Sequence, residues 1–428
     1  MAEKKKTKAF PNFEIFQELK KEISLLDCVS FAENHLTIDG KPFNLSNSGW
    51  RYMAELYRMI SAQIENKNAK PIVLVKGRQV GATIMAAVLS LHMAASGLYG
   101  TAAGKPVIRV MHAFPDLKRC SVYAKDILAA MISGAVEDYI AKRNLKNVRS
   151  SAEDTQTEKN FIGNNKIRVD SMGVTGDRIR GSTQDILFLD EIQDMSKTAI
   201  ENTVRVLQAS PYGATTQGVQ VYFGTPKHAG SYFWQIWQNS DKRFYQLKCL
   251  VCEQHFQLYN LESENWNEIW VEKDIVQCPH CGKKQKKGEA MDAGHWVATR
   301  PFDENGNVPK YIGYHFNMML SPLYTKEQVL EYWPEHNKNA SERSWKNETK
   351  GEFYSASATP LTLEEVYTNC LDESRGIAKS ITDPSGRMFF LGMDWGEIVE
   401  TSKDLATKRG KFYTCAVIFS IDTLGVLT

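Results

Sequence analysis

The chain of 428 residues lacks any long apolar run, and this absence excludes several classes of protein. No stretch approaches the about 20 consecutive apolar residues that a membrane-spanning helix needs. The N-terminus reads Met-Ala-Glu-Lys-Lys-Lys-Thr-Lys, with no apolar segment behind its charges, so it is not a secretory signal. We therefore expect a soluble protein that works inside a cell and has no membrane partner.

A dominant charge of either sign is also missing. Fifty-two Lys and Arg residues are balanced by 50 Asp and Glu residues, which leaves a net charge of +2. Because a balanced total exerts no global attraction, any contact with nucleic acid must come from local patches. Internal repeats and low-complexity segments are absent as well. The length favours two or three domains.

Short apolar strands alternate with helical patterns between residues 46 and 240. Residues 71–76 form a β-branched apolar run, and the alanine-rich segment 83–96 reads as the helix that follows it. Further runs of strand length lie at residues 107–112, 186–189 and 219–223. This alternation predicts an α/β domain with a mostly parallel sheet that helices cover on both faces.

The loop after the first of these strands has the context of a phosphate loop. Gly81 and Thr83 stand where the pattern G-x-x-x-x-G-K-[ST] expects its second glycine and its magnesium-binding hydroxyl. Lys76 replaces the first glycine and Ala82 replaces the usual lysine, so an ordinary strand–turn–helix is the alternative. A cationic side chain is still needed near the phosphates, and Lys76 and Arg78 are the only basic residues in the loop. The candidate nucleotide-binding residues are Lys76, Gly77, Arg78, Gln79, Val80, Gly81, Ala82 and Thr83.

Two carboxylates follow a later apolar strand. Asp190 can hold Mg²⁺, directly or through water, and Glu191 can take a proton from the attacking water. The alternative is a strand that ends in a solvated acidic turn. A third strand ends in Gly224 and Thr225, a place where motor ATPases sense the γ-phosphate. The upstream loop makes the ATPase interpretation of both strand ends the stronger one.

Eight cysteines are present, and four of them form two Cys-x-x-Cys pairs, at Cys249 and Cys252 and at Cys278 and Cys281. Four thiolates at such turns predict a closed, structural Zn²⁺ site, with free thiols or a redox pair as the alternatives. Four lysines follow between residues 283 and 287; they either contact DNA phosphates or form a solvated surface.

Taken in order, these motifs resemble the large terminase subunit of tailed bacteriophages, particularly its lambda-like branch. The resemblance covers roughly residues 45–400. It rests on the displaced lysine, on an Arg-Gly segment at residues 177–182 before the two acids, on the cysteine pairs, and on the segments 313–323 and 345–348. It implies a RecA/ASCE-like P-loop ATPase that hydrolyses ATP with Mg²⁺. Its work would be to drive double-stranded DNA through a portal protein into an empty capsid.

The resemblance also implies partners and residue roles. We expect the portal, the small terminase subunit and a homo-oligomeric ring as partners, in the cytoplasm of an infected bacterium. Lys76 and Arg78 would contact phosphates, and Thr83 and Asp190 would serve Mg²⁺. Glu191 would activate water. Gly224 and Thr225 would couple hydrolysis to movement, and Arg178 or Arg180 would be an arginine finger.

The last apolar strand, which leads into Asp394, resembles the first strand of the RNase H-like nuclease that closes the terminase chain. Asp394 would be the first of several carboxylates around two metal ions. Only one more strand follows before Thr428, so we expect the nuclease to be incomplete and this chain not to cut DNA alone.

The expected organisation is an N-terminal segment followed by four parts. The N-terminal segment covers residues 1–45. The four parts after it are an ATPase domain at 46–240, a zinc-ribbon insert at 241–300, a helical linker or lid region at 301–385 and the nuclease start at 386–428. Two other functions stay open. One is an ATP-dependent helicase or translocase, and the other is a zinc-containing DNA-binding protein with an inactive P-loop.

Overall fold

The computed structural model describes residues 23–133, 157–214, 218–259, 265–303 and 305–354, and the backbone of two strands at 388–395 and 414–421. The chain forms two compact units, residues 1–354 and residues 355–428. Each unit is described by itself.

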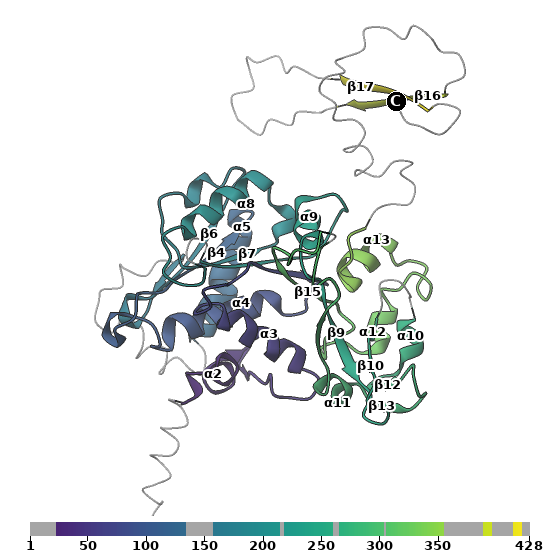
Figure 1. Cartoon of the computed structure of the whole chain (residues 1–428), viewed down its shortest axis with the longest axis horizontal. Coiled ribbons are helices and arrows are strands. Elements are labelled where there is room, and N and C mark those ends of the chain that lie inside the picture. The colour runs from purple at the N-terminus through teal and green to yellow at the C-terminus, as the bar shows by residue number, and fades with distance from the viewer. Residues whose placement is uncertain are drawn as a thin grey trace, which may run out of the picture. The chain divides into compact units, whose positions relative to one another are not determined.

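One large sheet organises the first unit (Figure 1). Its described strands follow the order β10-β9-β15-β3-β8-β7-β4-β6-β5, and β14 also pairs with β9. Neighbouring strands from β9 through β6 run parallel, and β5, β10 and β14 pair antiparallel. The mostly parallel α/β sheet that the sequence predicted is therefore confirmed. The strands are β3 (Ile72–Lys76), β4 (Arg109–Phe114), β5 (Glu158–Asn160), β6 (Lys166–Ser171), β7 (Ile186–Asp190), β8 (Val219–Gly224), β9 (Arg243–Lys248), β10 (His255–Phe256), β14 (His295–Ala298) and β15 (Ile312–Phe316).

Both faces of this sheet are covered, as the side chains of its central strand show. In β3, Ile72 and Leu74 belong to one buried cluster, whereas Val73 and Val75 belong to a second. Successive side chains of a strand point to opposite faces, so a strand buried on both sides must be apolar throughout. Every residue of β3 is buried accordingly.

Helices supply the two covering layers (Figure 1). The first cluster includes buried residues of α2, α3 and α4, and the second includes residues of α8 and α9. Local signals fix the helix starts; the Ser196 side chain, for example, accepts a hydrogen bond from Ala199 N at the start of α8. These helices are α2 (Cys28–His35), α3 (Arg51–Ala62), α4 (Ala82–Ala95), α5 (Leu117–Val122), α8 (Lys197–Val204) and α9 (Tyr232–Gln238). The helix α5 continues through η2 (Tyr123–Ala129) into α6 (Ala130–Ser133). None of the described helices is long and apolar enough to cross a membrane.

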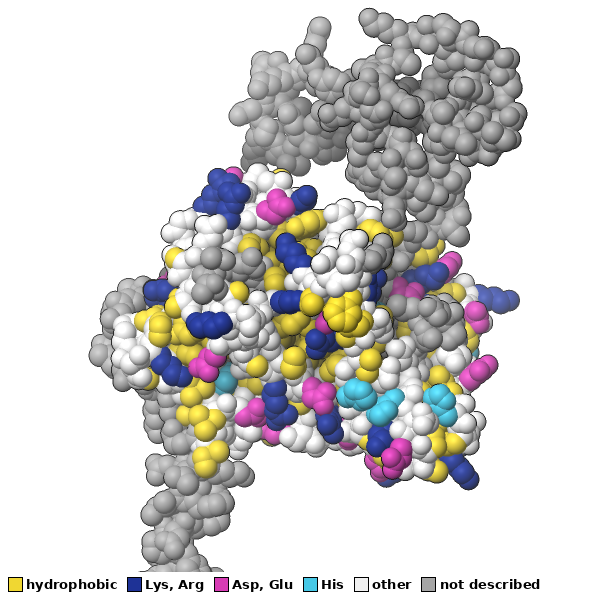
Figure 2. Space-filling model, in the orientation of Figure 1, with side chains coloured by type: hydrophobic (Ala, Val, Ile, Leu, Met, Phe, Trp, Pro, Cys, Tyr) yellow, Lys and Arg dark blue, Asp and Glu magenta, His cyan; other side chains and the backbone are white. Residues whose placement is uncertain are grey.

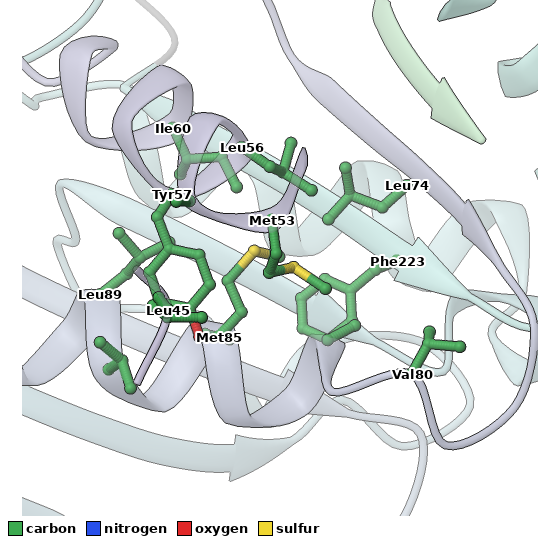
Figure 3. Close-up of a cluster of buried hydrophobic side chains, with 14 of the residues drawn as sticks. Leu45, Met53, Leu56, Tyr57, Ile60, Leu74, Val80, Met85, Leu89 and Phe223 are labelled. Atoms are coloured by element: carbon green, nitrogen blue, oxygen red, sulfur yellow. The ribbon is translucent and has the colours of Figure 1, made fainter. Parts of the chain in front are cut away.

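The core beneath the loop at residues 76–83 joins elements that are distant in sequence (Figure 3). Met53 and Leu56 of α3 lie beside Leu74 of β3, Met85 of α4 and Phe223 of β8, and all five are buried. This packing fixes where the loop starts and where the following helix points, because densely packed interiors resist small shifts.

One strand contradicts the expected helical linker at residues 301–385. Residues 312–316 form β15, which lies in the sheet between β3 and β9. A short run of this kind can be a buried strand or part of a helix. Its pairing partners lie far along the chain, 240 residues away in β3 and 71 residues away in β9, so periodicity alone did not identify it. Two short helices follow it, α12 (Lys326–Leu330) and α13 (Glu342–Ser344), and α13 continues into the π-helical turn η8 (Trp345–Lys350).

The cysteine-containing region is rooted in the same sheet through β9, β10 and β14. Between them lies a small antiparallel sheet of β11 (Trp270–Glu272), β12 (Ile275–Gln277) and β13 (Lys284–Lys286), flanked by α10 (Trp266–Ile269) and α11 (Lys287–Asp292). In the N-terminal segment, the short strands β1 (Thr37–Ile38) and β2 (Lys41–Pro42) pair with each other.

The second unit is described only by the backbone of β16 (Met388–Trp395) and β17 (Thr414–Ile421), which pair antiparallel.

On the face of the molecule drawn in Figure 2, basic and acidic side chains are interspersed. This mixture agrees with the balanced composition.

Candidate functional site

The loop at residues 76–83 turns sharply between β3 and α4. Gln79 and Gly81 have φ values of 55° and 88°, and Gly81 immediately precedes the helix. A left-handed conformation at Gln79 is uncommon for a residue with a side chain, and such strain gathers at binding sites. A Cβ atom at Gly77 would lie 2.8 Å from the carbonyl oxygen of Glu348, so only glycine fits there.

Asp190 ends β7 and points at the start of α4. Its Oδ2 accepts a 2.8 Å hydrogen bond from the Thr83 hydroxyl, while its Oδ1 is buried and has no partner among the described residues. Burial raises the pKa of Asp190 to about 7; the Lys76 ammonium opposes this rise and the Glu191 carboxylate adds to it. A buried carboxylate oxygen without a partner is a ready ligand for a cation.

Lys76 connects the three strand ends. Its side chain is only 6% exposed, and its Nζ lies 3.8 Å from Glu191 Oε1 and 3.3 Å from the Thr225 hydroxyl. Lys76 ends β3, and Glu191 and Thr225 directly follow β7 and β8. These three strands are adjacent in the sheet, and parallel strands present their carboxyl ends at one edge. The structure thus brings together the residues that the sequence singled out separately.

Glu191 is held in place by a residue that the sequence analysis missed. The Gln193 amide donates a 2.5 Å hydrogen bond to Glu191 Oε2, and Glu191 itself has a left-handed φ of 60°. A Cβ atom at Gly224 would lie 2.1 Å from the side-chain oxygen of Gln193, Oε1, and would collide with it. The glycine therefore leaves room for the Gln193 side chain. Nothing in the spacing of Gln193 distinguishes it from a surface glutamine.

Arg78 is paired with a glutamate from a distant part of the chain. Its guanidinium is 3.2 Å from Glu348 Oε2, and its backbone N–H donates to the Glu348 carbonyl oxygen at 2.6 Å. Both side chains are exposed. The η8 turn that carries Glu348 therefore packs directly on the loop at residues 76–83.

Two cavities flank this loop. One, of about 540 Å³, is mostly apolar and opens between the loop and the chain before β3. The other, of about 580 Å³, is polar and opens beside Glu191 and Thr225. The apolar cavity is lined by Lys76 and residues 79–84, and by Ile38, Pro42, Phe43, Asn44, Leu45, Asn47, Trp50, Met53, Tyr57 and Leu323. The sequence analysis named none of the lining residues outside the loop.

The two arginines expected to supply a finger lie elsewhere. Arg178 Nη2 is 4.0 Å from Asp170, and Arg180 pairs with Asp177 at 2.8 Å. Both side chains are more than half exposed, and neither lines the two cavities. A different arginine, Arg119, lines the polar cavity and binds Asp194 at 2.8 Å.

The four paired cysteines meet in one cluster. Their sulfur atoms all lie within 4.8 Å of one another, with 3.7 Å between Cys249 and Cys281 and 3.7 Å between Cys252 and Cys278. Four thiolates around a tetrahedral metal at about 2.3 Å are about 3.8 Å apart, so the cluster has the size of a single zinc site. It could hold that ion.

Asp394 lies on β16, and its side chain is outside the part of the chain that the structure describes.

The sheet and the groups gathered at its edge define an α/β protein of the kind that binds ligands at the carboxyl ends of parallel strands. Residues 40–296 match the family described as phage terminase large subunit gpA, ATPase domain, and the chain belongs to this family. ATP hydrolysis is the general activity of that domain. No curated protein matches this sequence.

Several solved structures are similar to the chain. The large terminase ATPase domain of Thermus phage P74-26 is 15% identical, with a TM-score of 0.37, over 69% of this chain and 93% of that one. The HK97 bacteriophage large terminase is 13% identical, with a TM-score of 0.36, over 50% of this chain and 40% of that one. The large terminase of a thermophilic bacteriophage is 12% identical, with a TM-score of 0.38, over 77% of this chain and 57% of that one.

Proposed function

We propose that this chain is the ATP-driven motor that packages double-stranded viral DNA into a procapsid through the portal, as a terminase large subunit. Family membership supports the class, and the meeting of Lys76, Asp190, Glu191 and Thr225 at one sheet edge supports the activity. The observation that carries the proposal is the buried Lys76 ammonium between a carboxylate and a hydroxyl, because it supplies the phosphate-binding cation that Ala82 cannot.

ATP would bind along the loop at residues 76–83. The loop amides, Lys76 and Arg78 would hold the phosphates, since a loop before a helix N-terminus favours anions. The base would enter the apolar cavity, where Trp50 and Asn47 are both among the lining residues. A cavity of about 540 Å³ that is mostly apolar with a few polar groups is typical of small-molecule sites.

Asp190 and Thr83 would hold Mg²⁺. The unpartnered, buried Oδ1 of Asp190 and the neighbouring hydroxyl fit a hard cation that prefers oxygen ligands. When bound, the ion neutralises charge that develops on the phosphate oxygens. Asp190 gives up its proton to serve as a ligand, and Lys76 stabilises the resulting carboxylate.

Glu191 would orient the attacking water and accept its proton. Gln193 fixes the Glu191 carboxylate, and Lys76 lies near its other oxygen. Gly224 and Thr225 would respond to loss of the γ-phosphate. Arg178 or Arg180 would act as a finger only on the nucleotide of a neighbouring copy in a ring, since both lie apart from the site of their own chain.

The remaining parts have separate roles. The four cysteines would bind a structural Zn²⁺, and Asp394 would belong to an RNase H-like nuclease. DNA, the portal and the small terminase subunit would be the partners, in the cytoplasm of the infected host.

ATP turnover with and without double-stranded DNA tests the proposal. We expect turnover that DNA stimulates and that Glu191→Gln lowers by about 10²–10⁴-fold, because the water loses its base. Glu201→Gln, an exposed glutamate of α8, is the matched control and leaves turnover unchanged. An inactive wild-type chain that still binds DNA would support the alternative of a zinc-containing DNA-binding protein, and strand separation would support a helicase.

A further inference from the structure

The strand end that carries Thr225 is bonded to a segment far along the chain. Two residues beyond Thr225, the carbonyl oxygen of Lys227 accepts a 2.8 Å hydrogen bond from the Asn347 side-chain amide and a 3.0 Å hydrogen bond from the backbone N–H of Tyr354. His228 and Tyr354 also form a parallel β-bridge. The loop after β8 is thus held from two directions.

Asn347 uses both of its amide protons in this arrangement. The second proton goes to the carbonyl oxygen of Glu352, also at 2.8 Å, and the side chain is only 4% exposed. A side-chain NH₂ group has two donors, and here each one binds a carbonyl of a different segment. One buried amide therefore ties the loop at 225–228 to residues 351–354.

Residues 351–354 also rest on the nucleotide loop. A Cβ atom at Gly351, which has a φ of 70°, would lie 3.0 Å from Gly77 N, and the His315 ring binds the Gly351 carbonyl oxygen at 3.1 Å. The first compact unit ends at Tyr354, and the second begins at the next residue. The segment that leaves the ATPase unit is therefore in contact with both loops of the candidate site.

We infer that Asn347 is a positioning residue that passes the state of the loop at 225–228 to residues 351–354, and so to the chain that leads into residues 355–428. The inference rests on the proposed function, since it assigns Thr225 to the γ-phosphate. When Thr225 and Lys76 engage a nucleotide, the Lys227 carbonyl moves with them, and the two amide bonds of Asn347 make residues 351–354 follow. Coupling of this kind requires a contiguous set of contacts that both sites bias.

Hydrogen exchange of the full chain tests the inference, because the Tyr354 N–H is itself bonded to the Lys227 carbonyl. Exchange at residues 351–354 is compared without and with Mg²⁺ and a non-hydrolysable ATP analogue. In the wild type we expect the analogue to change exchange there by about threefold or more, because a local opening is being shifted. In Asn347→Asp, whose carboxylate cannot donate, we expect that change to disappear while the analogue binds within about threefold of wild type.

Asn337→Asp is the matched control, because the Asn337 amide binds the Glu331 carbonyl oxygen on an exposed surface. It should keep the nucleotide-dependent change. Retention of the change in N347D, or a wild type that binds the analogue without any change at 351–354, would overturn the inference. Should N347D fail to fold, Asn347→Ser carries the same comparison. A wild type that binds no nucleotide contradicts the proposed function instead, which a separate binding measurement reveals.

Discussion

At the residue scale, the unusual group is Asp190, a carboxyl that is buried beside a hydroxyl and a lysine. Its folded-state pKa of about 7 lies above the ordinary value of 3.8, so between these values the folded chain binds a proton that the unfolded chain does not. The stability that this proton contributes is fully present below pH 3.8 and is lost as the pH rises through 7. Metal binding has the opposite dependence, because Mg²⁺ and the proton compete for the same oxygen atoms.

Mg²⁺ affinity should therefore fall in mild acid. Between pH 8 and pH 6 we expect binding of Mg²⁺ to weaken about tenfold, because the ionised fraction of a group with a pKa near 7 falls by that factor. Calorimetric titration of the nucleotide-free chain with Mg²⁺ measures it. Asp190→Asn should abolish the binding, whereas Asp185→Asn, at another buried carboxyl, should keep the dependence. Equal affinity at both pH values would contradict the assignment of Asp190 as the ligand.

At the scale of elements, the cysteine cluster joins two turns that short strands alone hold weakly. One turn lies between β9 and β10 and the other between β12 and β13, and strands of two or three residues carry few ladder bonds. The same region supports the η8 turn, because Trp266 packs against Trp345 at 5.7 Å between ring centroids. A metal in the cluster would therefore stabilise the elements that rest on the loop at residues 76–83.

Removal of this metal should destabilise the chain. We expect about one zinc ion per chain in the wild type, less than about 0.1 in Cys278→Ser, and a melting temperature lower by about 10 °C or more, because a closed four-thiolate site contributes several kcal/mol. Elemental analysis and calorimetry measure the two quantities. Cys120→Ser, at a buried thiol outside the cluster, should retain its zinc. A zinc-free wild type that melts at the same temperature as C278S would refute the site.

At the scale of the whole molecule, one chain does not place Arg178 or Arg180 at its own site. Both are exposed on a loop that α8 holds: Ser196 binds the Val174 carbonyl oxygen and Asn202 binds the Thr175 carbonyl oxygen. A fixed, exposed loop with two cations is suited to contact another copy of the chain. Hydrolysis would then depend on assembly.

A mixture of two inactive variants should recover activity if this is so. A chain with Arg178→Ala and Arg180→Ala keeps its carboxylates, and a Glu191→Gln chain keeps its arginines. When the two are mixed under assembling conditions, we expect ATP turnover at least about tenfold above the sum of the separate variants, since an arginine finger is worth 10³–10⁵ in rate. Turnover equal to that sum would show that these arginines do not act on a neighbour.

Much of the fold was predictable from sequence because its signals are local. The apolar strand before Lys76, the alanine-rich helix after it and the strand before Asp190 each lie where their patterns indicate. The strand β15 was missed because its identity depends on pairing with β3 and β9 rather than on its own residues. The same limit applies to Gln193 and Asn347, whose roles depend entirely on what they touch.

The sequence by itself determined the class of the protein, since strand–loop–helix order, a displaced lysine, paired acids and paired cysteines are all written in short segments. Only the tertiary structure decided which of these groups meet. It placed Lys76 beside Glu191 and Thr225 and left one oxygen of Asp190 buried without a partner among the described residues. It also formed an apolar cavity between the loop at residues 76–83 and the part of the chain that precedes β3. These are contacts between residues that are tens to hundreds of positions apart, and only burial and packing of the whole chain fix such distances.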